Sequence, residues 1–136
     1  MLVHLMLELY GCDRQLLSDE PLIRRVLDEY PGRVGMERVS PVHLYDIETS
    51  NPLDAGLSGF VVIAQSHISL HAWPEYGEVD IDICSCKEFS QEDAIAFDAG
   101  VSDGRCGVAL CSTWHTFLAP RDARPGTLRG RYGCTA

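Results

Sequence analysis

Residues 60–86 read FVVIAQSHISLHAWPEYGEVDIDICSC. Three strand-like runs in and around this stretch are separated by short polar or turn-forming segments, which predicts successive strands over 57–65, 67–72 and 78–86. Polar residues gather where the first run meets the second, and the WPEYG segment at 73–77 predicts a turn. Because a polar cluster at a strand end combines fixed geometry with ligand access, we expect the functional site here.

The flanking sequence predicts one domain over residues 1–136, an α/β (α+β) two-layer sandwich of mainly antiparallel sheet with helices on one face. Leucines alternate over 2–10, which predicts a first strand, and Ser18 or Asp19 is a candidate cap for a helix that ends at Pro31-Gly32. The remaining predicted elements are a strand over 34–45 interrupted at Pro41, a polar loop over 46–55, a helix over 90–99, a strand over 108–114 and a loosely ordered tail from Pro120.

The overall charge argues against nucleic acid as a partner. With 11 basic and 20 acidic residues the formal net charge is -9, which disfavours nucleic acid and is compatible with a small cationic substrate. The first residues contain no basic leader, and no stretch approaches a membrane span, so neither a signal peptide nor a membrane is expected. We therefore expect a cytoplasmic protein whose six cysteines are reduced.

The strand predicted over 78–86 has two chemically different faces. Because side chains alternate along a strand, Asp80, Asp82, Cys84 and Cys86 should share one face, opposite a Val/Ile face. Cys86 is therefore expected on the same side as two carboxylates.

The motif SHISLH, one residue, WPEYG and a cysteine nine residues after the glycine resembles the signature of bacterial and archaeal S-adenosylmethionine decarboxylases. Residues 5–13 (LMLELYGCD) and 56–59 (GLSG) resemble upstream segments of that family. The resemblance implies the same sandwich fold and a homodimer in which two sheets pack together. It also implies self-cleavage into 1–65 (β chain) and 66–136 (α chain), which leaves a covalent pyruvoyl group in place of Ser66, with no metal and no pyridoxal phosphate.

The activity implied by the resemblance is that of a carboxy-lyase in polyamine biosynthesis, which decarboxylates S-adenosylmethionine through a Schiff base. The residue roles implied are attack by Ser66 on the carbonyl of Gln65, support of the intermediate by Ser58, proton abstraction by His71, proton return by Cys86, and binding of the ribose hydroxyls by Glu75. Gln65, Asp54 and Asp82 are predicted as further substrate contacts.

Three departures from the family pattern involve four residues. Gln65 replaces a glutamate before the cleaved bond, Pro52 replaces a phenylalanine that stacks on adenine, and Glu78 and Asp80 replace small or aromatic residues. A site without that aromatic ring but rich in carboxylates (Asp54, Asp80, Asp82) would suit L-ornithine or L-arginine, giving putrescine or agmatine, and this alternative stays open.

The residues also bear on three other functions: a metal site, a serine hydrolase and a non-catalytic homologue. A metal held by His67 and His71 is disfavoured, because a strand separates residues four apart by about 13 Å. A serine hydrolase is disfavoured, because GLSGF at 56–60 lacks the final glycine of the nucleophile elbow. An unprocessed, non-catalytic homologue that acts as a binding partner remains open, because the uncharged Gln65 could slow cleavage.

Overall fold

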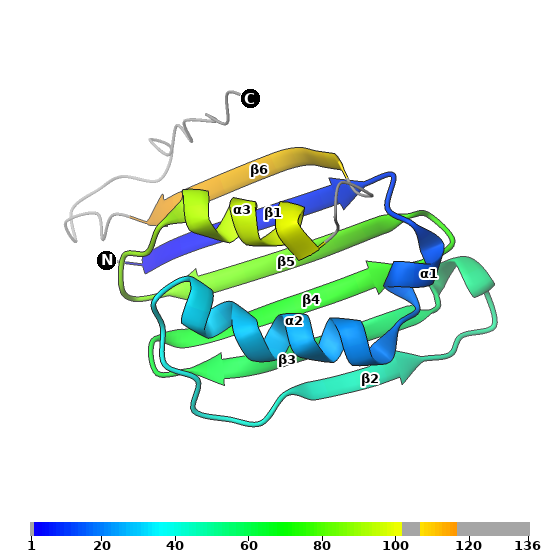
Figure 1. The fold of residues 1–136 in the computed structure, drawn as a ribbon, viewed down its shortest axis with the longest axis horizontal. Coiled ribbons are helices and arrows are strands. Elements are labelled where there is room, and N and C mark those ends of the chain that lie inside the picture. The colour runs from blue at the N-terminus through cyan, green and yellow to red at the C-terminus, as the bar shows by residue number, and fades with distance from the viewer. Residues whose placement is uncertain (1, 102–106, 117–136) are drawn as a thin grey trace, which may run out of the picture.

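The computed structural model describes residues 2–101 and 107–116, in which the strands form one antiparallel sheet and the helices all lie on one of its faces (Figure 1). The strand order is β2-β3-β4-β5-β1-β6. The strands are β1 Leu2–Tyr10, β2 His43–Ile47, β3 Gly56–Ile63, β4 Ser66–Trp73, β5 Glu78–Ser85 and β6 Gly107–Thr116. The helices are α1 Arg14–Leu17, α2 Glu20–Arg33, the 3₁₀ turn η1 Pro52–Asp54, and α3 Gln91–Val101. The predicted fold class is confirmed.

The core lies between the sheet and the helices. Every second residue of β1, β3, β4 and β5 is buried on the helix-covered side, as period-two alternation predicts. The residues buried there include Leu5, Leu7, Val61, Ile63, Ile68, Leu70, Ile81 and Ile83. The opposite face carries no helix of the described residues, and it exposes Met6, Tyr10, Tyr45, Phe60 and Val62 by more than a third of their surface. This surface is the open face of the sheet.

Helix α2 is the main cover of the core. Its cap is Asp19, whose side chain accepts the backbone N–H of Leu22 at 3.0 Å, as predicted. The helix continues past Pro31 to Arg33, so the predicted end at Pro31-Gly32 is wrong. Pro31 lies in the last turn and is fully buried, and there the lost hydrogen bond is offset by apolar burial.

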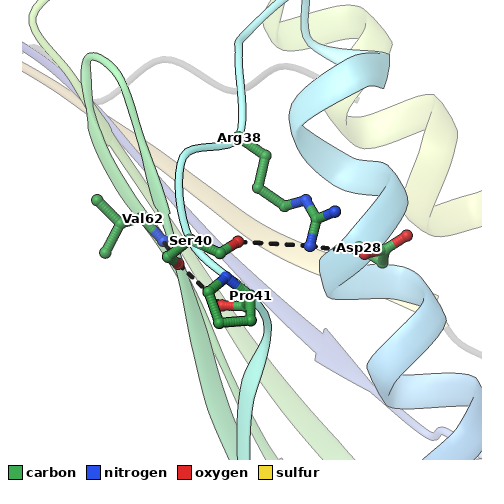
Figure 2. A network of polar contacts seen from close by, with 5 residues as sticks. All are labelled: Asp28, Arg38, Ser40, Pro41 and Val62. Carbon is green, nitrogen blue, oxygen red and sulfur yellow. Dashed lines mark hydrogen bonds and ion pairs between the residues drawn. The ribbon is translucent and has the colours of Figure 1, made fainter.

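The strand predicted over 34–45 is confirmed only in its last residues, because regular pairing begins at His43 and continues to Ile47. Before His43, Arg38 forms a single bridge with Ile63 of β3, and the N–H of Val39 donates to the carbonyl of Val62 at 2.9 Å. Pro41 has no N–H with which to continue this pairing. A side chain takes the place of regular backbone pairing here (Figure 2). The hydroxyl of Ser40 accepts the N–H of Val62 at 2.9 Å and donates to the carbonyl of Pro41 at 2.8 Å. Arg38 ties this segment to α2 through Asp28, at 2.9 Å.

Smaller corrections concern element ends and one cysteine. The third predicted strand is two residues too long, because Ala64 and Gln65 form a turn before β4 begins at Ser66. Cys12 is disulfide-bonded, so the prediction of reduced cysteines is wrong at this position. The predicted tail from Pro120 lies outside the described residues. In the described part of the chain, no helix has the length and apolar character needed to cross a membrane.

Candidate active site

Gln65 and Ser66 lie at the tip of the tightest hairpin in the described sheet. Ile63 pairs with Ser66, so only Ala64 and Gln65 connect β3 to β4. Ser66 has φ 153°, and among the described residues it is the non-glycine residue with a positive φ. L-residues rarely adopt such a conformation, and it persists only where the surroundings hold it. The backbone is therefore strained at the bond where cleavage is predicted.

The carbonyl of Gln65 is held from the neighbouring strand. The backbone N–H of Cys86, just past the end of β5, donates to the Gln65 oxygen at 3.1 Å. On the upstream side of the turn, the N–H of Ala64 donates to the carbonyl of Glu37 at 2.9 Å. Both flanks of the predicted cleavage site are thus fixed by hydrogen bonds from segments outside the hairpin.

The hydroxyl of Ser66 contacts the imidazole of His67, a residue for which the sequence predicted no role in cleavage. Its Oγ lies 3.1 Å from Nδ1 of His67. A neutral imidazole with its proton on Nε2 can accept the hydroxyl proton through Nδ1. The adjacency of Ser66 and His67 in the motif was the signal available for this contact.

His71 lies in a row of polar side chains that crosses the open face. The register pairs Ser58 with His71 and His71 with Asp80, and Tyr45 and Glu8 extend the row on the outer sides. Directly opposed residues on adjacent strands project from the same face. The structure therefore places Ser58 and His71 side by side on this face.

Asp80 is the member of this row with a perturbed acidity. Burial raises the pKa of its carboxyl above the usual 3.8, and the nearby Glu8 carboxylate raises it further, while His71 opposes the shift. The Tyr10 hydroxyl donates to Glu8 at 2.9 Å, and this hydrogen bond raises the pKa of Tyr10, as do the nearby carboxylates. The row thus concentrates negative charge beside His71.

Glu75 lies at the far end of β4, in the turn before β5. Its carboxylate forms an ion pair with Arg14, and both residues line a pocket of about 220 Å³ together with Ser18, Asp46, Pro52, Ala55, Gly56, Leu57 and Pro74. The ring of His71 stacks toward Trp73, with centroids 6.0 Å apart. Glu75 therefore lies beyond the end of β4 that contains His71, away from the end that contains Ser66.

Two other predicted substrate contacts, Asp82 and Asp54, already have intramolecular partners. Asp82 lies mid-strand on the open face, where Oδ1 is 2.6 Å from Nε2 of His4. Asp54 ends the 3₁₀ turn and accepts from the amide of Asn51 at 3.0 Å. Cys86 is an exposed free thiol beyond the end of β5, not within the strand as predicted, because pairing stops at Ser85.

The predicted catalytic residues therefore form two separate groups within one chain. Gln65, Ser66 and Cys86 lie at the β3–β4 turn, whereas Ser58, His71 and Glu75 lie toward the opposite end of these strands. Ser66 and His71 are five residues apart on β4, which corresponds to about 16 Å at roughly 3.3 Å per residue. His67 and His71 lie on the same strand, and no cluster of three or more His, Cys, Asp or Glu residues suited to a metal occurs among the described residues.

Comparison with known proteins identifies the family. The family model described as "S-adenosylmethionine decarboxylase" matches residues 3–99. The chain is 36% identical over 88 residues to the S-adenosylmethionine decarboxylase proenzyme of Archaeoglobus fulgidus, covering 65% of this chain and 73% of that one. It is 36% identical over 93 residues to the proenzyme of Methanococcus aeolicus, covering 68% and 74%. The match to the Caldicellulosiruptor saccharolyticus proenzyme is 36% identical and covers 62% and 64%.

A solved structure supports the fold. The crystal structure of the adenosylmethionine decarboxylase from Aquifex aeolicus VF5 matches with a TM-score of 0.69 and 23% identity, covering 91% of this chain and 97% of that one. As the sequence motif predicts, the chain belongs to the S-adenosylmethionine decarboxylase family, a family of carboxy-lyases.

Proposed function

We propose that this protein is a self-processing, pyruvoyl-dependent decarboxylase of polyamine biosynthesis whose substrate is S-adenosylmethionine. The observation that carries the proposal is the strained backbone at Ser66 together with the fixed carbonyl of Gln65. Ser66 has a strained positive φ in a two-residue turn, and the carbonyl before it accepts a fixed N–H. Strain that the surroundings hold in place is typical of residues with a chemical role.

Cleavage follows from these groups in two stages. In the first, Ser66 Oγ forms a bond to the Gln65 carbonyl carbon and the amide C–N bond breaks, while the hydroxyl proton passes to the Ser66 nitrogen, with His67 as the nearest acceptor. In the second, loss of the Ser66 α-proton expels the Gln65 carboxylate from Cβ. Hydrolysis of the resulting enamine, through its imine form, then releases ammonia and leaves a ketone at position 66.

The chain's residues fit this converted group. A pyruvoyl ketone at position 66 would supply an electron sink for the electron pair released with carbon dioxide. The proposed proton donor is the thiol of Cys86, which is exposed and lies in the residue whose backbone N–H contacts Gln65. Because lysine anchors pyridoxal phosphate and the chain has a single lysine, Lys87, the pyruvoyl group is the better supported electron sink.

A second copy of the chain completes the proposed site. His71 and Ser66 are too far apart in one chain to act on one substrate atom, and the pocket beside Glu75 is smaller than the roughly 300–1,000 Å³ typical of ligand sites. The open face exposes Phe60, Val62 and Met6, an apolar patch that a partner sheet would bury. In a two-fold dimer packed through these faces, the turn of one protomer would meet the His71 row of its partner.

One observation favours a second candidate substrate. Glu8 and Asp80 place negative charge next to His71, and Asp82 lies one step along the same strand face. These carboxylates could bind the side-chain cation of L-ornithine or L-arginine, for which no adenine contact is needed.

Release of carbon dioxide from carboxyl-labelled S-adenosylmethionine, L-ornithine and L-arginine tests the proposal. We expect the highest kcat/KM with S-adenosylmethionine, and none above background for the Ser66→Ala variant. Higher kcat/KM with a dibasic amino acid would select the second candidate. A cleaved protein inactive on all three would contradict both, and an uncleaved, inactive one would favour the binding-partner reading.

A further inference from the structure

Among the residues whose burial the structure describes, Ser85 is the buried polar side chain that neither the motif nor the proposed chemistry uses. It is 0% exposed, in contrast to Cys86 and Lys87, which follow it and are exposed. Its hydroxyl accepts the N–H of Lys87 at 3.0 Å and donates to the carbonyl of the same residue at 2.7 Å. A buried hydroxyl with both hydrogen-bonding functions used locally fixes the backbone around it.

The segment that Ser85 fixes carries the donor to the predicted cleavage site. Cys86 lies between the two residues joined by these bonds, and its N–H reaches the Gln65 oxygen at 3.1 Å. Ser85 is also the register partner of Ser66, so the turn after β5 lies alongside the strained residue. The orientation of the Cys86 amide is thus set by a side chain that does not itself touch the reacting atoms.

We infer that Ser85 is a positioning residue for chain cleavage, and that through it the backbone amide of Cys86 serves as an oxyanion donor. The inference rests on the proposed function. When Ser66 Oγ adds to the Gln65 carbonyl, negative charge develops on the oxygen that this N–H already contacts. A preorganised donor at that oxygen lowers the barrier, and loss of one such donor costs about 10²–10³ in rate in well-studied acyl-transfer sites.

The first test compares Ser85→Ala with Ser85→Thr, with cleavage followed by denaturing mass spectrometry from the moment of synthesis. Alanine removes both hydrogen bonds and should slow cleavage at least tenfold, whereas threonine retains the hydroxyl and should restore most of the rate. Ile83→Val is the matched control, since it removes a buried methylene from the same strand but leaves the turn unchanged. If Ile83→Val lowers Tm as much as Ser85→Ala and slows cleavage equally, the role of Ser85 is merely structural.

The second test separates the amide of Cys86 from its thiol. Cys86→Ala keeps the N–H and should cleave at near the wild-type rate, whereas Cys86→Pro removes the N–H and should cleave about 10²-fold more slowly or not at all. Circular dichroism checks that the proline variant is folded. If the proline variant is unfolded, the comparison of Ser85→Ala with Ser85→Thr alone tests the inference.

The outcomes distinguish the two proposals. If the wild-type protein cleaves and Ser85→Ala cleaves at the same rate, the positioning role is wrong and the proposed function stands. If the wild-type protein never cleaves, both are wrong.

Discussion

Ser66 and His71 lie five residues apart on β4, toward opposite ends of the strand. The register places Ser66 opposite Ile63 and Ser85, beside the β3–β4 turn. It places His71 opposite Ser58 and Asp80 on the open face. One chain cannot bring these two residues to a single substrate, so the proposed activity depends on two copies that exchange their halves of the site.

Co-expression of Ser66→Ala and His71→Ala chains should therefore restore activity that neither variant has alone. Random pairing makes half of the dimers mixed, and each mixed dimer has one intact composite site, so we expect about one quarter of the wild-type decarboxylase activity. The measurement is carbon dioxide release from S-adenosylmethionine by the co-purified mixture.

Mixing Ser66→Ala with Cys86→Ala is the control, because both changes fall in the same half of the site and no mixed dimer has an intact one. Recovery in the control pair, or none in the test pair when mixed dimers form, would contradict the composite site.

Tyr45 is expected to contribute aromatic contact with adenine that Pro52 cannot supply. It is 55% exposed and is the register partner of Ser58 on the open face. Stacking on a base is worth about 1–3 kcal/mol, so Tyr45→Ala should raise KM for S-adenosylmethionine by about fivefold or more, whereas Tyr45→Phe should change it little. An unchanged KM in steady-state kinetics of Tyr45→Ala would exclude this contact.

Asp80 should make the protein less stable at neutral pH than in mild acid. The folded-state pKa of its carboxyl lies above the usual 3.8, so the folded state binds more protons than the unfolded state between these values. This contribution to stability is complete below 3.8 and is lost as the pH rises through the folded pKa. Asp80→Asn should therefore raise Tm at neutral pH, with the gain vanishing well below pH 3.8.

Thermal unfolding across this pH range checks the Asp80 prediction. Glu8→Gln, which removes one cause of the shift, should give a smaller gain with the same pH dependence. A gain in Tm for Asp80→Asn that is independent of pH would argue against a titration effect.

Gln65→Glu should destabilise the uncleaved chain at neutral pH. Oε1 of Gln65 is buried and has no hydrogen-bond partner among the described residues. A carboxylate at this point would lack donors, so its pKa should be raised and its charge should cost stability, a loss that shrinks as the pH falls below the glutamate value of about 4.3.

The Gln65 prediction is measured in a Ser66→Ala background, which keeps every chain whole. Gln65→Met, of similar shape but without the orphaned oxygen, should leave Tm equal to or above that of the parent. A higher Tm for Gln65→Glu than for Gln65→Met at neutral pH would mean that a donor reaches this side chain.

The alternation in the sequence was sufficient to predict the central strands and most of the sheet. It failed at residues 34–42, because one hydroxyl, that of Ser40, replaces a strand carbonyl next to Pro41. It also failed at the β3–β4 turn, because apolar residues such as Ala64 carry no turn signal.

For the candidate site, the sequence suggested which residues to consider but only part of their arrangement. A strand rises about 3.3 Å per residue, which keeps His67 and His71 too far apart to share a metal and also keeps Ser66 far from His71. The separation of the site into two groups could therefore be predicted from the sequence. The role of Ser85 could not be predicted, because nothing in the sequence indicates that a serine at a strand end uses its hydroxyl to close the following turn. The contact between Cys86 and Gln65 depends on that turn as well.

Denaturing mass spectrometry of freshly purified and incubated protein tests the central claim most directly. The account predicts that the 15.0 kDa chain gives way to two chains, residues 1–65 and residues 66–136, the second with a blocked amino end. Ser66→Ala should stay whole. A wild-type chain that remains a single 15.0 kDa species after long incubation would contradict the account.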